Sequence, residues 1–256
     1  MNEKLARLWD TKNKNDEWWS SFVTSPLAIA FNYLFVDIEW LTPNLLTIFS
    51  FFVAIIAAVF IISGGMVNFI IAAVLINVSH VLDCMDGQMA RYRKTPSLSG
   101  GFYDKLTDQI QVALWFGAVG YAAYVQSHHI APVLLAFVGV VFYNLRGYIK
   151  YVGIFTEMTR DSQYLDKVSK LVSKNKIPAG LGCSLLVNLK WLAAEQRKIF
   201  LFDEGVFIFM LSISLVFNVL IPMLWVFALS QVFYGIFRGW RQGLRIDHNK
   251  LEFIKK

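Results

Sequence analysis

Aspartates at helical spacing mark one short segment of the chain that could do chemistry. Asp83 and Asp86 are three residues apart, and Asp104 and Asp108 are four residues apart. If the segment is helical, each pair shares one face of its helix. Pro96 lies between the two pairs and favours a tight return of the chain. Two neighbouring helices could therefore direct both acidic faces at each other.

Carboxylates gathered in this way predict bound cations, because buried like charges are unfavourable without compensation. Mg²⁺ or Mn²⁺ would suit an all-oxygen site, and such ions stabilise phosphate groups during transfer. Gly87 and Ala90, on the face of Asp83, and Gly100, one turn before Asp104, would leave room for a nucleotide. Arg91 could pair with a phosphate through its planar guanidinium group. The segment thus predicts metal-dependent chemistry on a phosphate compound.

Long stretches without basic residues indicate the elements that position this segment. The chain is 56% hydrophobic and only 16% charged, whereas a soluble domain carries about a quarter charged residues. All 24 Lys and Arg residues fall outside 44–86, 106–145 and 199–237. A single helix over one such stretch would be roughly 60 Å long, about twice the hydrocarbon thickness of a bilayer. Each stretch is therefore predicted to be a helical hairpin that crosses the membrane twice.

The predicted fold is an all-α integral membrane protein with six transmembrane helices. The predicted spans are 44–63, 66–82, 109–126, 130–147, 201–218 and 220–237. Their external turns are expected at 63–65, 126–129 and 218–222, where turn-forming residues gather. Since basic residues favour the cytoplasmic side, both termini and the aspartates are placed there.

The regions outside the spans complete the predicted organisation. Residues 1–43 are assigned to a cytoplasmic N-terminus, loosely ordered over 1–15, with an amphipathic interfacial helix over 16–40. A seventh span is the alternative for 16–40. Residues 44–238 form the predicted transmembrane catalytic domain, which includes a cytoplasmic loop at about 149–200, and 239–256 form a cytoplasmic tail.

The aspartate segment resembles the signature of a known family, the CDP-alcohol phosphotransferases. That signature reads D-x2-D-G-x2-A-R-x8-G-x3-D-x3-D, and every position is present with its spacing intact, as Asp83, Asp86, Gly87, Ala90, Arg91, Gly100, Asp104 and Asp108. The resemblance implies that the four aspartates hold two Mg²⁺ or Mn²⁺ ions and that Asp108 is also the general base. It implies that Gly87, Ala90, Arg91 and Gly100 surround the CDP group. It further implies a homodimer.

The expected reaction transfers a phospho-alcohol group from a CDP-alcohol donor to a hydroxyl acceptor and releases CMP, as in phospholipid biosynthesis. A phosphatidyl group from CDP-diacylglycerol is favoured. The alternative is transfer from a CDP-linked small alcohol, of the inositol, choline or ethanolamine type, to a lipid or polyol-phosphate acceptor. Arg146 and Lys150 lie where the fourth span meets the cytoplasm and could hold an anionic acceptor or a lipid phosphate. Simple anchoring of their charges at the interface is the alternative.

Two other functions of a basic membrane protein, transport and nucleic-acid binding, fit the sequence less well than transferase activity does. A transporter would favour charged residues near the middle of the bilayer, whereas all 18 acidic residues lie in or beside the basic segments. CMP formation would separate the two functions. Nucleic-acid binding is set aside, because the sequence contains no recognisable module for it.

Overall fold

The computed structural model describes residues 2–13, 17–168 and 185–247, and no strand occurs among them. The all-α prediction is thus confirmed for the described residues. Their helices follow in chain order as α1 (Glu3–Asp10), a π-helical turn (Ser20–Thr24), α2 (Ser25–Phe35), α3 (Pro43–Ser63), α4 (Met66–Arg93), α5 (Leu98–Ser127), α6 (Ala131–Arg160), α8 (Leu185–Glu195), a 3₁₀ turn (Gln196–Leu201), α9 (Glu204–Val216) and α10 (Leu220–Asp247).

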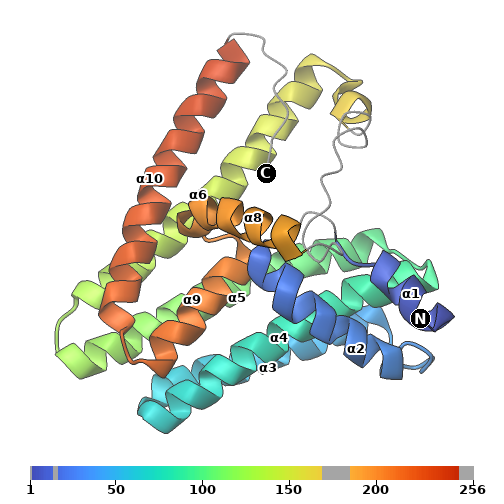
Figure 1. Cartoon of the computed structure of the whole chain (residues 1–256). Coiled ribbons are helices and arrows are strands. Elements are labelled where there is room, and N and C mark those ends of the chain that lie inside the picture. Colours follow the sequence, from blue (N-terminus) through green and yellow to red (C-terminus); the bar gives the residue numbers. More distant parts are fainter. Residues whose placement is uncertain (1, 14–16, 169–184, 248–256) are drawn as a thin grey trace.

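Three helical hairpins, α3–α4, α5–α6 and α9–α10, form the body of the molecule (Figure 1). The turns between their helices contain residues with positive φ: Gly64 at 68°, Gly65 at 84°, His128 at 57° and Asn218 at 52°. Glycine and asparagine adopt this left-handed region more readily than most residues. The three turns lie where the sequence predicted them.

Within the described part of the chain, four helices are long and apolar enough to cross a membrane: α3, α4, α6 and α10. The chain is accordingly an integral membrane protein by helix length and composition. The third predicted span lies in α5, whose first turns carry charged residues, and the fifth corresponds to α9, which has only 13 residues. A helix of that length covers about 20 Å. The topology with six spans therefore stays a prediction.

Two predicted boundaries differ from the helices of the structure. The fifth span was expected from residue 201, but Phe202 adopts a left-handed conformation with φ 51°, so α9 begins only at Glu204. The loop predicted at 149–200 was expected to begin after the fourth span, but α6 continues to Arg160. Residues 169–184 of this loop lie outside the described part of the chain.

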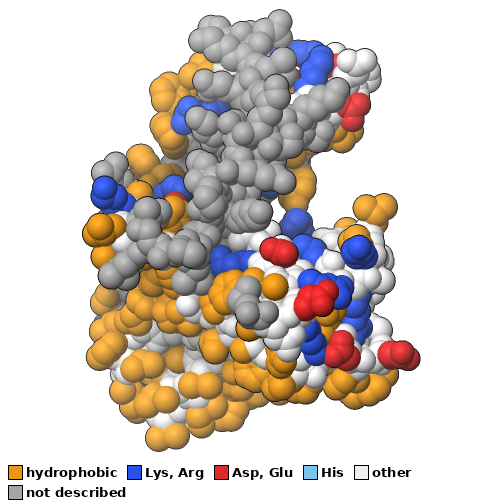
Figure 2. Space-filling model, turned by 45° about the vertical axis from the view of Figure 1, so that its right-hand side comes forward, with side chains coloured by type: hydrophobic (Ala, Val, Ile, Leu, Met, Phe, Trp, Pro, Cys, Tyr) orange, Lys and Arg blue, Asp and Glu red, His pale blue; other side chains and the backbone are white. Residues whose placement is uncertain are grey.

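Hydrophobic side chains cover the lower left of the molecular surface in Figure 2, and charged side chains gather in its upper and right-hand parts. This segregation suits a protein that sits in a bilayer with one polar end. The charged side of the molecule is thus the expected site of contact with water-soluble substrates.

Aromatic side chains fill the core where α5, α9 and α10 meet. The rings of Phe116 and Phe227 stack with centroids 3.6 Å apart, and Phe207 lies 6.3 Å from Phe116. Gly139 on α6 faces the ring of Phe227. Small residues at such contacts let membrane helices approach closely, so this glycine allows α6 and α10 to pack together.

Gly139→Ala should therefore destabilise the fold by about 1–3 kcal/mol, because the added Cβ would overlap the ring of Phe227. Thermal unfolding in detergent measures the effect. Gly147→Ala on the same helix is the matched control, since a Cβ there meets no atom within 4 Å. This control should be neutral or slightly stabilising. Equal losses in both variants would contradict the packing assigned to Gly139.

The N-terminus is more ordered than the sequence suggested. Residues 1–15 were expected to be loosely ordered, but residues 3–10 form α1, and Leu8 is completely buried. Lys4 pairs with Asp37, and the guanidinium group of Arg7 lies 4.4 Å from the ring centroid of Tyr92. The prediction was wrong because these partners are distant in sequence. Within 16–40, residues 18–35 are helical, and their interfacial position stays a prediction.

Arg93, at the end of α4, fastens the segment that joins α2 to α3. Its guanidinium group donates hydrogen bonds of 2.7–2.9 Å to the carbonyl oxygens of Val36, Ile38 and Leu41. In the sequence, Arg93 is one of several basic residues on the predicted cytoplasmic side, so its position alone indicates only topology. Its partners give it a structural role instead.

Arg93→Lys should lower stability by about 1–3 kcal/mol, because a single ammonium nitrogen cannot span three carbonyl oxygens as the planar guanidinium group does. Thermal unfolding and limited proteolysis between residues 36 and 41 would measure the change. Arg160→Lys is the control, because Arg160 makes one exposed bond, to the carbonyl of Ile246. A comparable loss in both variants would argue against the assigned role.

Candidate active site

The four aspartates lie at the end of the α4–α5 pair, opposite the α3–α4 turn. Asp83 and Asp86 belong to the last turns of α4, and Asp104 and Asp108 belong to the first turns of α5. The return between these helices is short, because α4 ends at Lys94 in a left-handed conformation and Ser97 caps α5. The acidic pairs consequently lie on neighbouring helices, as the sequence predicted.

Three of the aspartates converge closely enough to share a cation. Asp83, Asp104 and Asp108 each offer a carboxylate oxygen, and these oxygens lie within 4.8 Å of one another. Oδ1 of Asp83 and Oδ1 of Asp108 are buried without a hydrogen-bond donor among the described residues. Buried oxygens of this kind are costly to leave without a partner. An all-oxygen donor set fits Mg²⁺ or Mn²⁺.

The raised pKa values of two carboxyl groups on α5 also favour a bound cation. Burial, and then the Glu204 carboxylate, raises the pKa of Asp108 to about 9. Burial also raises the pKa of Asp104, although the nearby Lys105 opposes this shift. Both groups precede the predicted span 109–126. A bound cation reverses such shifts, since it stabilises the ionised carboxylate. The site is thus arranged for cations rather than for isolated negative charges.

Asp86 stands slightly apart from the other three aspartates. It is 7% exposed, and its Oδ2 accepts a hydrogen bond from Oγ1 of Thr47 on α3. Thr47 is one helical turn from the start of α3, which is capped by Thr42. Nothing in the spacing of the aspartates suggested Thr47, because the contact joins two helices. It holds the carboxylate of Asp86 in place at the edge of the cluster.

A cavity of about 1110 Å³ unites all the site residues that the sequence indicated. The wall includes the eight motif residues together with Arg146 and Lys150. It also includes further basic residues that come from the segment before α9 and from α10, namely Lys198, Arg238, Arg241 and Arg245. The cavity therefore has an acidic floor on α4 and α5 and a basic wall on α6 and α10.

The motif glycines lie at close approaches in this cavity. A Cβ on Gly87 would be 3.2 Å from Nη1 of Arg91, and one on Gly100 would be 2.9 Å from Oδ1 of Asn44. Nε of Arg91 donates a 2.7 Å hydrogen bond to the carbonyl oxygen of Thr11. The segment after α1 thus orients Arg91, a contact that the sequence did not predict.

Arg146 is buried in the basic wall and already has protein partners. Its Nη1 donates to the carbonyl oxygen of Leu201 and to Oε1 of Gln231, each at 2.5 Å, and its Nη2 lies 3.9 Å from Asp203. Lys150 follows one turn later on α6 and lines the same cavity. Arg146 consequently braces the chain before α9, and a substrate role for Lys150 stays a prediction.

Sequence reasoning missed two acidic residues beside the aspartates, Glu17 and Glu204. Glu17 accepts a hydrogen bond from the backbone N–H of Gly205, and burial raises the pKa of Glu17. Glu204, at the start of α9, lies near His80 and Asp83. In the sequence, His80 is only a polar residue within the predicted span 66–82. The contacts join residues more than 100 positions apart, so no local spacing could have revealed them.

Fold and site together define a class of protein: an integral membrane helical bundle with an acidic, metal-compatible site on a helical pair. Comparison with known proteins agrees. The sequence model of the CDP-alcohol phosphatidyltransferase family matches residues 40–234. Because the match covers most of the chain, the protein belongs to this family and is a CDP-alcohol phosphotransferase family enzyme.

A curated relative gives a second, more distant comparison. A Thermococcus kodakarensis protein named "Bifunctional IPC transferase and DIPP synthase" is 26% identical over 168 residues, which are 64% of this chain and 36% of that protein. The chain therefore spans little more than a third of the length of this relative.

Proposed function

We propose that the protein transfers a phosphatidyl group from CDP-diacylglycerol to the hydroxyl group of an acceptor and releases CMP. The observation that carries the proposal is the convergence of Asp83, Asp104 and Asp108 in one cavity with the rest of the family motif. A transporter is disfavoured, because the chain belongs to a family of transferases.

The α4–α5 end of the cavity is assigned to the CDP group. Asp83, Asp86, Asp104 and Asp108 would hold two Mg²⁺ or Mn²⁺ ions, which supply charge neutralisation for the pyrophosphate of the donor. Gly87, Ala90 and Gly100 keep space for the nucleotide. The guanidinium group of Arg91, oriented by the carbonyl of Thr11, pairs with a phosphate.

Asp108 is assigned as the general base. Its carboxylate accepts the proton of the acceptor hydroxyl while the acceptor oxygen forms a bond to the β-phosphorus. The bond from that phosphorus to the oxygen bridging to the α-phosphate breaks, and CMP leaves with this oxygen. The orientation of both substrates in one cavity makes the attack effectively intramolecular.

The basic wall is assigned to an anionic acceptor, such as an alcohol phosphate. Lys150 and the α10 arginines Arg238, Arg241 and Arg245 line this side of the cavity. We assign Arg146 the role of holding this side of the cavity in place, since its guanidinium group is hydrogen-bonded to Leu201 and Gln231. These basic side chains would stabilise an anionic acceptor that binds next to the aspartates.

An apolar stripe on α5 supports a lipid-linked donor. Leu98, Phe102 and Leu106 follow at intervals of four residues and are 98%, 63% and 45% exposed. Such a stripe beside the site favours contact with acyl chains rather than with water. A homodimer and the cytoplasmic orientation of the site remain part of the proposal.

The decisive experiment is CMP release by the purified protein with Mg²⁺ or Mn²⁺ and CDP-diacylglycerol, against a panel of acceptors. Alcohol phosphates are expected to support release, and uncharged alcohols less so. Release only from a CDP-linked small alcohol would overturn the phosphatidyl assignment and favour the small-alcohol donor. No release with either donor would remove the transferase proposal for this chain.

A further inference from the structure

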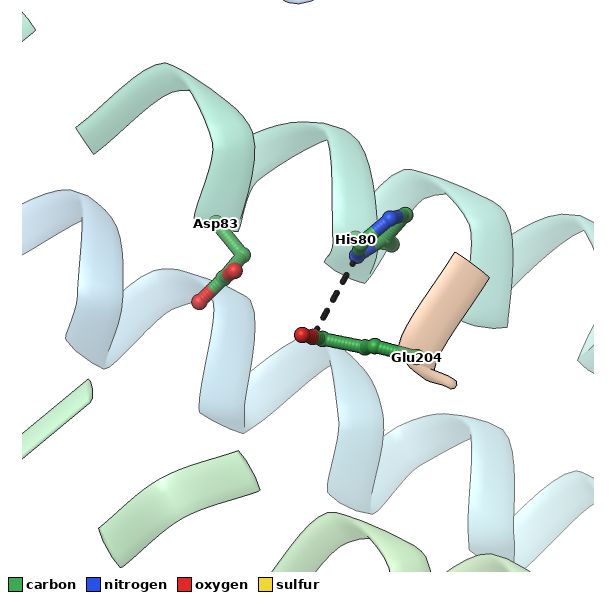
Figure 3. Close-up of side chains that lie close together, drawn as sticks. All are labelled: His80, Asp83 and Glu204. Atoms are coloured by element: carbon green, nitrogen blue, oxygen red, sulfur yellow. Dashed lines mark ion pairs between the residues drawn. The ribbon is translucent and has the colours of Figure 1, made fainter. Parts of the chain in front are cut away.

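His80 and Asp83 on α4 and Glu204 on α9 form a second cluster beside the four aspartates. Figure 3 shows the three side chains converging, with His80 and Asp83 on one helix and Glu204 reaching them from the other. Each offers a ligand atom, and these atoms lie within 4.8 Å of one another. The cluster differs chemically from the aspartate site, because it adds an imidazole nitrogen to the oxygen donors.

The imidazole of His80 is held in an orientation that suits a ligand. Its side chain is only 4% exposed, and Nε2 lies 2.9 Å from Oγ of Ser20. When Nε2–H donates a hydrogen bond to this hydroxyl, Nδ1 presents its lone pair to the cluster. A second bond of this kind is what commonly orients metal-binding histidines. Ser20 belongs to the π-helical turn, a local irregularity that often occurs at functional sites.

The separation between His80 and Glu204 also suits an intervening ion. Nδ1 of His80 is 3.5 Å from Oε1 of Glu204, which is beyond ordinary hydrogen-bond distance. Two ligands that each lie about 2.1 Å from a tetrahedral zinc ion are about 3.4 Å apart. The observed spacing is close to that value.

A third observation comes from Asp83. Its Oδ1 is buried and has no hydrogen-bond donor among the described residues. A bound cation would satisfy this oxygen, and it would separate the negative charges of Asp83 and Glu204. Because Asp83 also belongs to the aspartate site, the two sites would share one carboxylate.

We propose that His80, Asp83 and Glu204 bind a divalent transition-metal ion, Zn²⁺ or Mn²⁺, in addition to the ions of the four aspartates. The site has three protein ligands, and all three line the large cavity. A fourth position is thus open to water or to a hydroxyl group of a substrate. The proposal concerns binding and does not depend on which donor the enzyme uses.

Nitrogen coupling to bound Mn²⁺ tests the proposal directly, because the aspartate site offers only oxygen. The tag-free full chain in detergent is stripped of metal, loaded with Mn²⁺ and studied by pulsed electron paramagnetic resonance. Wild-type protein should show ¹⁴N coupling, and His80→Gln and Glu204→Gln should lose it. Asp108→Asn should keep it, because Asp108 is outside this cluster. The double variant His128→Gln, His129→Gln should also keep it.

Either of two results would overturn the site: Mn²⁺ bound to the wild type without nitrogen coupling, or coupling that survives in His80→Gln. Glu204 is 38% exposed, so Glu204→Gln should fold even if His80→Gln does not, and it then decides the test. CMP release from the same preparations is scored separately. Nitrogen coupling without CMP release would support this metal site and reject the proposed function. CMP release without nitrogen coupling would support the proposed function and reject this metal site.

Discussion

Asp108→Asn should lower CMP release by roughly 10²–10⁴-fold, the usual contribution of a general base. Asparagine has nearly the same size as aspartate, but it cannot accept the proton of the acceptor hydroxyl. Because burial and Glu204 raise the pKa of Asp108 to about 9, its ionised form is unfavourable in the metal-free protein. The neutral variant should consequently be no less stable. Initial rates of CMP release and thermal unfolding measure the two effects.

The matched control for this substitution is Asp37→Asn. Asp37 pairs with Lys4 at the surface, and its side chain is 68% exposed. The control should keep wild-type activity, because exposed ion pairs contribute little and Asp37 does not line the cavity. Substantial turnover in Asp108→Asn would move the base to another group, and Glu204 would be the first carboxylate to examine.

Sequence reasoning was most successful where the determinants are local. The turns at Gly64 and Gly65 and at His128 follow from residues that break helices between apolar stretches. The convergence of the aspartate pairs follows from their spacing and from the short return after Lys94. Such features depend on neighbours within about one helical turn.

Features set by packing between distant segments could not be predicted. The position of Arg93 in the sequence indicates only topology, yet its partners are carbonyl oxygens more than 50 residues away. Glu204 approaches the aspartates only because Phe202 ends one helical segment and α9 starts again beside α4. Arg146 is likewise engaged by Leu201 and Gln231. The contacts of Glu17 and of His80 with α9 could not be predicted for the same reason, because their partners there are more than 100 residues away in the sequence.

Removing divalent cations should abolish CMP release, and Mg²⁺ or Mn²⁺ should restore it. Without cations, the converging carboxylates of Asp83, Asp104 and Asp108 repel one another and the pyrophosphate of the donor. Ion binding should also stabilise the fold, by about 2.7 kcal/mol when the free ion is at a hundred times its dissociation constant. Dialysis against a chelator, followed by activity and thermal-unfolding measurements across a titration of each ion, checks both effects.

A carboxylate variant shows whether the stabilisation comes from this site. Asp104→Asn removes one charge of the cluster, so the metal-dependent rise in unfolding temperature should shrink, whereas Asp37→Asn should keep the full rise. Asp104 is preferable to Asp83 here, because Asp83 is shared with the His80 cluster. Full activity in the presence of chelator would show that the four aspartates act without metal. Ionised Asp108 would then require another source of positive charge, and Lys105, which already opposes the rise in the pKa of Asp108, is the first candidate.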